Sequence, residues 1–182
     1  MGRLVELRTE LERYAAPSDA QERSHRERML ALCSSSGDPF SRDHFAPGHF
    51  TASAFVLSPD QSALLLIFHG KLHRWLQPGG HVDASDLDIL GAARREVREE
   101  VGLSDLPLAR PGIFDLDIHA IPPLKADPTH EHFDVRFLFQ ASDLAFRAGS
   151  DAKAARWVPL TEISEETSDR SVMRAVEKLR GR

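Results

Sequence analysis

The chain has 182 residues, of which 41% are hydrophobic and 28% are charged, and its formal net charge is −5. This length and composition fit one globular domain with a sizeable core and a small appendage. The negative charge argues against a protein that coats nucleic acid or an acidic membrane. The single cysteine, Cys33, rules out an internal disulfide and favours a reducing compartment. Because no stretch is apolar enough to span a membrane and the N-terminus lacks a signal-peptide core, we expect a cytoplasmic protein.

The first part of the chain is predicted to form two helices. Three leucines recur at helical spacing within residues 3–14, and Ser18 is placed to cap a second helix that reaches about Leu32. A connector rich in glycine, proline and serine follows. We therefore divide the chain into an N-terminal helical extension, residues 1–36, and a main domain, residues 37–182. The extension offers a contact surface for a homodimer.

The main domain combines strand and helix patterns. The sequence predicts strands at 49–57, 63–69, 112–120, 132–140 and 155–160, and helices at 86–101 and 169–180. A proline and an aspartate between the first two strands are typical of a hairpin connection. This order of elements indicates a single mixed α/β domain.

The helix predicted at 86–101 carries three glutamates within five residues, Glu96, Glu99 and Glu100. Positions i, i+3 and i+4 share one face of a helix, and like charges there are destabilising unless a cation neutralises them. Since all the ligands are hard oxygens, we expect Mg²⁺ or Mn²⁺. The alternative is a solvated helix face on which arginine and glutamate form ion pairs.

The surroundings of the glutamates favour the metal site over the solvated face. Ser85 can cap the start of the helix, and Gly102 is placed to end it. Just upstream, the tight loop Pro78-Gly79-Gly80 lets backbone carbonyls approach a ligand closely. The helix also has an apolar side opposite the acidic one, formed by Leu90, Ala93, Val97 and Val101.

The segment 79–103 resembles the Nudix box, G-x5-E-x7-R-E-U-x-E-E-x-G-U, in which U is a bulky aliphatic residue. The first half departs from the pattern, because Asp86 stands where the box has glutamate and eight residues, not seven, separate it from the box arginine. Asp88 is the alternative replacement. By resemblance, the residue at this position pairs with the box arginine, Arg95, and supports the loop. The second half matches at every fixed position, namely Arg95, Glu96, Val97, Glu99, Glu100, Gly102 and Leu103.

The resemblance implies an α/β/α sandwich with a mixed sheet and a metal-dependent pyrophosphohydrolase. Such an enzyme would cleave a nucleoside diphosphate linked to another moiety, such as a nucleotide sugar. By resemblance, Glu96 and Glu100 bind the metal directly, and the carbonyl of Gly79 completes the shell. Glu99 is either a further ligand or binds a water held by the metal. Arg95 orients the carboxylates, and we expect it to act in catalysis together with Glu99 and Glu100. The catalytic base, the number of ions and the substrate stay open.

Two other functions are compatible with the resemblance. A Nudix module without turnover would bind or sense nucleotides, and the Asp86 departure supports it whereas the intact second half of the box argues against it. An enzyme resembling isopentenyl diphosphate isomerase would need a reactive cysteine near the glycine loop. Cys33 lies in the helical extension instead, which argues against the isomerase.

A second group of polar residues occupies the strand around residues 130–136. Its apolar residues alternate along the strand and are expected to form a core row: Phe133, Val135, Phe137 and Phe139. His130 and His132 lie in the other row, together with Asp134 and Arg136. A His-x-His pair can bind zinc, but two histidines near a loop are more often ordinary polar residues. We favour phosphate binding or proton transfer for them, and a simple ion pair for Asp134 with Arg136. Glu131 is our candidate for a later acidic residue that joins the metal site and catalysis, with Asp134 second.

Further substrate contacts are expected around the glycine loop and in a proline-rich loop. Trp75 could stack on a base, although a tryptophan beside a strand is more often packing. His73, His81 and Lys125 could reach a phosphate, and His119 is near enough in a hairpin to join His130 and His132. The predicted substrate-binding set is therefore Trp75, His81, Lys125, His130 and His132, whereas His25, His44 and His49 are given no role.

Overall fold

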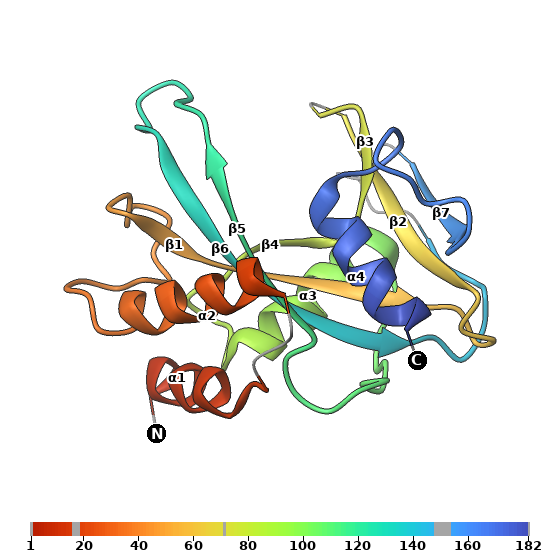
Figure 1. Cartoon of the computed structure of the whole chain (residues 1–182), viewed down its shortest axis with the longest axis horizontal. Helices are drawn as coiled ribbons and strands as arrows, with labels where there is room; N and C mark the ends of the chain where they lie inside the picture. The colour runs from red at the N-terminus through yellow and green to blue at the C-terminus, as the bar shows by residue number, and fades with distance from the viewer. Residues whose placement is uncertain (1, 16–18, 71, 148–153, 182) are drawn as a thin grey trace.

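The computed structural model of the protein describes residues 2–15, 19–70, 72–147 and 154–181, and Figure 1 shows helices on both faces of a mixed sheet. The α/β sandwich expected from the sequence is therefore confirmed. Within the described residues no helix has the length and apolarity needed to cross a membrane. The elements are α1 (Arg3–Arg13), α2 (Ala20–Leu32), β1 (Gly48–Leu57), β2 (Ala63–His69), β3 (Arg74–Leu76), β4 (Gly79–His81), α3 (Ile89–Val101), β5 (Asp115–Ile121), β6 (His130–Gln140), β7 (Ala155–Pro159) and α4 (Arg170–Arg180).

The sheet is built around β1, all of whose residues are buried. The strand order is β3-β2-β1-β6-β5, with β4 paired to β1 and β7 paired to β2. β6 runs parallel to β1 over its full length, whereas the other pairings are antiparallel. The glycine loop expected from the sequence is thus a short strand, because Gly79–His81 pairs with Thr51–Ser53 of β1.

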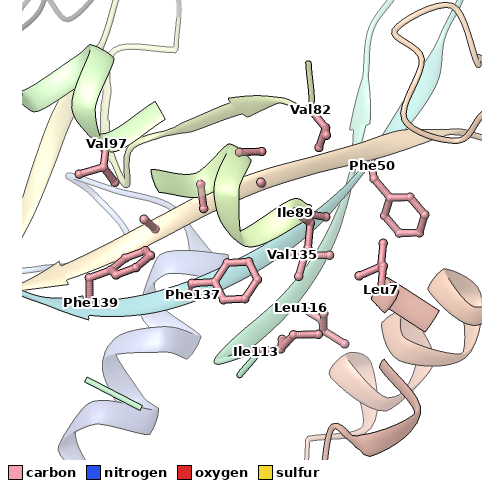
Figure 2. Packing of buried hydrophobic residues seen from close by; sticks show 14 of the residues in the cluster. Leu7, Phe50, Val82, Ile89, Val97, Ile113, Leu116, Val135, Phe137 and Phe139 are labelled. Carbon is pink, nitrogen blue, oxygen red and sulfur yellow. The ribbon is translucent and has the colours of Figure 1, made fainter. Parts of the chain in front are cut away.

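The alternation of side chains divides β1 and β6 between two cores, one on each face of the sheet. On one face, Phe133, Val135, Phe137 and Phe139 form the predicted core row. Figure 2 shows Val135 and Phe137 in the same cluster as Ile89 and Val97 of α3 and Leu7 of α1. The opposite face is covered by α4, through Val172, Ala175, Val176 and Leu179. A fully buried Val, Leu, Ile or Phe side chain contributes about 1.5–3 kcal/mol, so this packing holds α3 and α4 in place on the sheet.

The N-terminal helices pack on the sheet instead of standing apart from it. Leu7 and Leu11 of α1 and Met29 of α2 are buried in the same cluster as the aromatic row of β6. α2 is capped by Asp19, whose carboxylate accepts a hydrogen bond from the amide of Glu22 at 2.9 Å. The cap expected at Ser18 lies outside the described residues. The division at residue 36 and the homodimer stay predictions.

A cluster of buried charges ties α4 to the sheet. Arg136 of β6 is fully buried and lies 2.8 Å from Asp134, 3.3 Å from Asp115 and 3.2 Å from Asp117. Arg174 of α4 also contacts both Asp115, at 2.9 Å, and Asp117, at 3.1 Å. The ion pair expected for Asp134 with Arg136 therefore belongs to a larger network that fixes the face of the sheet opposite α3.

Candidate active site

β4 brings the two glycines of the box against the acidic face of α3. A Cβ atom added to Gly80 would lie only 2.6 Å from Oε1 of Glu96, so the carboxylate packs directly on the bare glycine. The amide of Gly79 donates a hydrogen bond to Oε2 of Glu100 at 2.9 Å. The glycines thus position two of the carboxylates that the sequence predicts as metal ligands.

Arg95 is the centre of the hydrogen-bond network around these carboxylates. Its Nη1 donates to Oε1 of Glu96 at 2.8 Å and to Oε2 of Glu99 at 3.0 Å. Its Nε and Nη2 donate to the two carboxylate oxygens of Asp86 at 3.1 and 3.0 Å, and Nη2 also donates to the carbonyl of His81 at 2.8 Å. Because one planar guanidinium makes all these bonds, it sets the orientation of both glutamates.

The altered first half of the box keeps the contact that the resemblance assigns to its glutamate. Asp86 binds Arg95 through both carboxylate oxygens, so the shorter side chain still reaches the guanidinium. Asp88 has another role, because it caps α3 by accepting a hydrogen bond from the amide of Gly91 at 2.6 Å. The expectation that Ser85 caps the helix is wrong. Gly102 ends the helix as expected, with a φ of 70°.

The electrostatics of the site suit a bound cation. Burial raises the pKa of Glu96 above its ordinary value, Arg95 opposes the rise, and the nearby charge of Glu99 adds to it. Hydrogen bonding to Asp86 raises the pKa of Arg95, which stays charged. A half-buried carboxylate beside other carboxylates gains from a divalent ion, and oxygen ligands are those that Mg²⁺ and Mn²⁺ prefer. The residues present therefore fit such an ion.

Glu131 is not brought together with the glutamates of α3. Its carboxylate forms an ion pair with Arg28 of α2. In the sheet register it lies opposite Gly48 of β1, whereas Gly80 lies opposite Ala52. That difference corresponds to about 13 Å along the strand. The pairing with Arg28 indicates a structural role at the junction of α2 and β6.

Two of the predicted substrate contacts also lie away from the acidic face of α3. Trp75 of β3 stacks beneath the guanidinium of Arg156, whose Cζ is 4.2 Å from the ring centroid, and packs against Phe68 at 5.4 Å. Lys125 is exposed in the turn between β5 and β6, at the end of the long hairpin that projects from the sheet in Figure 1. The packing role weighed for Trp75 describes its position better than base stacking.

Histidines from four strands gather on the other face of the sheet. His132 lies at the centre, with ring centroids 5.1 Å from His81, 5.4 Å from His130 and 5.5 Å from His119. The expectation that His119 joins His130 and His132 is thus confirmed. His49 was not expected, yet its ring is 4.8 Å from that of His132. Strand alternation places it on this face, but only the parallel pairing of β1 with β6 brings it to His132.

Comparisons with known proteins identify the fold and the family. Residues 47–176 match the NUDIX domain family, whereas no curated protein matches the chain. A NUDIX-family hydrolase from Clostridium perfringens is 21% identical, with a TM-score of 0.51 over 72% of this chain and 96% of that one. The NUDIX domain of Shewanella oneidensis NrtR, complexed with ADP ribose, is 20% identical, with a TM-score of 0.52 over 72% and 86%.

A third similar structure is the dihydroneopterin triphosphate pyrophosphohydrolase of E. coli. It is 14% identical and has a TM-score of 0.54 over 71% of this chain and 92% of that one. At these identities the likeness of the three structures shows the fold alone, and the family match carries the assignment. Since that match spans most of the chain and contains the box, the protein belongs to the Nudix family of hydrolases, which act on pyrophosphate bonds and are typically dependent on divalent metals.

Proposed function

We propose that the protein is a Mg²⁺- or Mn²⁺-dependent pyrophosphohydrolase that splits a nucleoside diphosphate linked to another moiety, such as a nucleotide sugar. The observation that carries this proposal is the set of carboxylates that Arg95 and the glycines of β4 hold together on α3. Glu96, Glu99, Glu100 and the carbonyl of Gly79 would hold the ion. When bound, a divalent ion neutralises phosphate oxygens and lowers the pKa of a bound water.

The residues of the chain supply the placement on which such a reaction depends. Arg95 keeps Glu96 and Glu99 in fixed orientations, and the amide of Gly79 does the same for Glu100. Asp86 neutralises and orients the guanidinium, so that Arg95 does not rotate towards an anionic substrate. Preorganised carboxylates need no rearrangement when the substrate arrives, which lowers the barrier.

The ligand of one similar structure and the substrate in the name of another support the substrate class. ADP ribose contains a diphosphate that joins a nucleoside to a sugar, and dihydroneopterin triphosphate contains a chain of phosphoanhydrides. Both compounds present the type of bond that the carboxylate site is suited to cleave. Direct substrate binding by Trp75, His81, Lys125, His130 and His132 stays a prediction.

A hydrolysis screen tests the proposal. The purified chain would be incubated with Mg²⁺ or Mn²⁺ and with nucleotide sugars, ADP ribose, dinucleotide polyphosphates or nucleoside triphosphates. We expect one class to be split into a nucleoside monophosphate and a phosphorylated remainder. Glu100→Gln should lower kcat/KM at least about 100-fold, since the ion contributes several kcal/mol to the transition state.

Glu10→Gln is the matched control, because Glu10 is exposed on α1 and lies outside the site. It should keep the activity of the wild-type protein. If no class is turned over while nucleotides still bind, the protein is a binding module and the hydrolase proposal fails. If Glu100→Gln is as active as the control, the carboxylates of α3 do not carry the reaction.

A further inference from the structure

Three histidines from three strands converge on the face of the sheet opposite α3. They are His49 of β1, His81 of β4 and His132 of β6, and one nitrogen of each lies within 4.8 Å of the others. β1 pairs with both β4 and β6, and in Figure 1 the first halves of β1 and β6 lie to the left of α4. None of the three belongs to the carboxylate site described above.

Strand register explains why the rings meet. His49 lies directly opposite His132 in the parallel pairing of β1 with β6. Thr51 lies opposite His81 in the antiparallel pairing of β1 with β4, and its side chain points to the same face as that of His49. The three imidazoles therefore lie side by side on one face of the sheet, and the strand pairing fixes their positions.

His49 carries a buried nitrogen that lacks a partner. Its side chain is almost completely buried, with the residue 1% exposed, and within the described part of the chain its Nε2 has no hydrogen-bond partner. Its Nδ1 lies 3.4 Å from the carbonyl of His44. Because a carbonyl can only accept, this contact places the proton on Nδ1 and leaves a lone pair on Nε2. A buried nitrogen with an unused lone pair costs free energy unless something binds it.

We propose that His49, His81 and His132 bind one transition-metal ion, with Zn²⁺ as the preferred ion. Imidazole nitrogens suit zinc, copper, nickel and iron but not Mg²⁺, so the site would discriminate against the ion proposed for the carboxylates. Nitrogens in a tetrahedral zinc site are about 3.3 Å apart, so the rings, whose nitrogens lie within 4.8 Å of one another, would close by about 1.5 Å at most around the ion. Three histidines leave a fourth position for water, for His119 or for His130.

The protonation of the rings agrees with metal binding better than with phosphate binding. Burial lowers the pKa of His81 to about 4 and that of His132 to about 2, and it also lowers the pKa of His49. Neutral rings have free lone pairs for a metal, whereas they have no positive charge with which to attract a phosphate. This argues against the phosphate contact predicted for His81 and His132, whereas no role was predicted for His49.

The position of His81 couples the histidine cluster to the carboxylates across one strand. Its ring points to His49 and His132, while its carbonyl accepts the hydrogen bond from Nη2 of Arg95. An ion bound by the three histidines restrains the backbone of β4 on the face opposite the carboxylates. Gly79 and Gly80 belong to the same strand and are restrained with it. The ion therefore supports the geometry of the carboxylate site without touching the substrate.

Metal binding by the full chain tests the inference directly and does not depend on hydrolysis. Protein stripped with a chelator would be titrated with Zn²⁺ and Co²⁺ in excess Mg²⁺, followed by the visible spectrum of Co²⁺ and by metal analysis after desalting. We expect one tightly bound ion per chain in the wild-type protein. His132→Asn and His81→Asn should each weaken zinc binding at least about 100-fold, since even partners that only support a ligand contribute 10–100-fold.

Two controls separate this site from others. His73→Asn removes a histidine outside the cluster at a position with a φ of 52°, which asparagine tolerates. Glu100→Gln alters the carboxylate site. Both should bind zinc as the wild-type protein does, and zinc should raise the Tm of both. The inference is overturned if the wild-type protein binds no zinc in excess Mg²⁺, or if Glu100→Gln loses the ion. It is also overturned if folded His132→Asn and His81→Asn bind zinc as tightly as wild type.

Discussion

Gly80 is the residue at which the smallest change should act on the site with the least effect on the fold. Gly80→Ala places a Cβ 2.6 Å from Oε1 of Glu96, at the end of a flexible side chain, so the carboxylate must move. We expect kcat/KM to fall about 10- to 100-fold, corresponding to about 1.4–2.7 kcal/mol, while the Tm changes little. Steady-state kinetics and thermal unfolding measure the two effects. Equal activity of Gly80→Ala and wild type would show that Glu96 needs no contact with a bare glycine.

Residue spacing predicted the carboxylates of the site and the approach of His119 to His132, but not the position of His49. Glu96, Glu99 and Glu100 belong to one helix, whose geometry fixes their common face from local sequence alone. His49 and His132 are brought together by the pairing of two strands far apart in the chain. No periodicity within either strand specifies which other strand it pairs with, so the contact of His49 with His132 could not be predicted.

The start of α3 illustrates how a prediction at the scale of an element fails and why. Both Ser85 and Asp88 are good capping residues, and only the fold of the preceding turn decides between them. In the structure Asp86 is turned towards Arg95 and also accepts a hydrogen bond from the amide of Asp83. The chain therefore enters the helix at Ile89, and Asp88 becomes the cap.

The two capped helices that flank the sheet offer a matched test of that assignment. Asp88 caps α3, and Asp169 caps α4 by accepting a hydrogen bond from the amide of Val172 at 2.8 Å. Asp88→Ala and Asp169→Ala should each lower the free energy of unfolding by about 1 kcal/mol, within a range of about 0.5–2. Urea unfolding measures this loss. Only Asp88→Ala should also reduce kcat/KM, because α3 carries the glutamates; an equal loss of activity in both would point to global destabilisation.

At the scale of the whole molecule, the sequence predicted the helix and sheet layers but not the buried ion pairs that connect α4 to the sheet. The strand and helix patterns and the box predicted a sandwich, and the apolar row of β6 was assigned to the core correctly. The alternation within β6 predicted the ion pair of Arg136 with Asp134, but not the contacts of Arg136 with Asp115 and Asp117 of β5. Their meeting beneath α4 depends on the packing of three elements, and local patterns contain no information about it.

This charge network should make the free energy of unfolding depend on pH in the acidic range. Although burial opposes ionisation, Arg136 and Arg174 hold the pKa values of Asp115 and Asp117 below their usual range. Between the lowered native pKa and the unfolded value of about 3.9, the unfolded chain binds more protons than the native one. The stabilisation is therefore complete above about pH 4 and is lost progressively as the pH falls below it, which urea unfolding across pH 2.5–6 would detect.

Removal of the buried arginine tests the network as a unit. Arg136→Met leaves Asp134 with the hydroxyls of Thr51 and Ser53 but without the cation, and Asp115 and Asp117 with one cation fewer each. We therefore expect the free energy of unfolding near neutral pH to fall by about 3–5 kcal/mol. In this variant the free energy of unfolding should fall less steeply below pH 4, because the pKa values of Asp115 and Asp117 move back towards those of the unfolded chain. Arg13→Met, at an exposed position on α1, should change stability by no more than about 0.5 kcal/mol. If the free energy of unfolding of Arg136→Met falls below pH 4 as steeply as that of the wild-type protein, then Arg174 and Lys178 of α4 are enough to hold the aspartates charged.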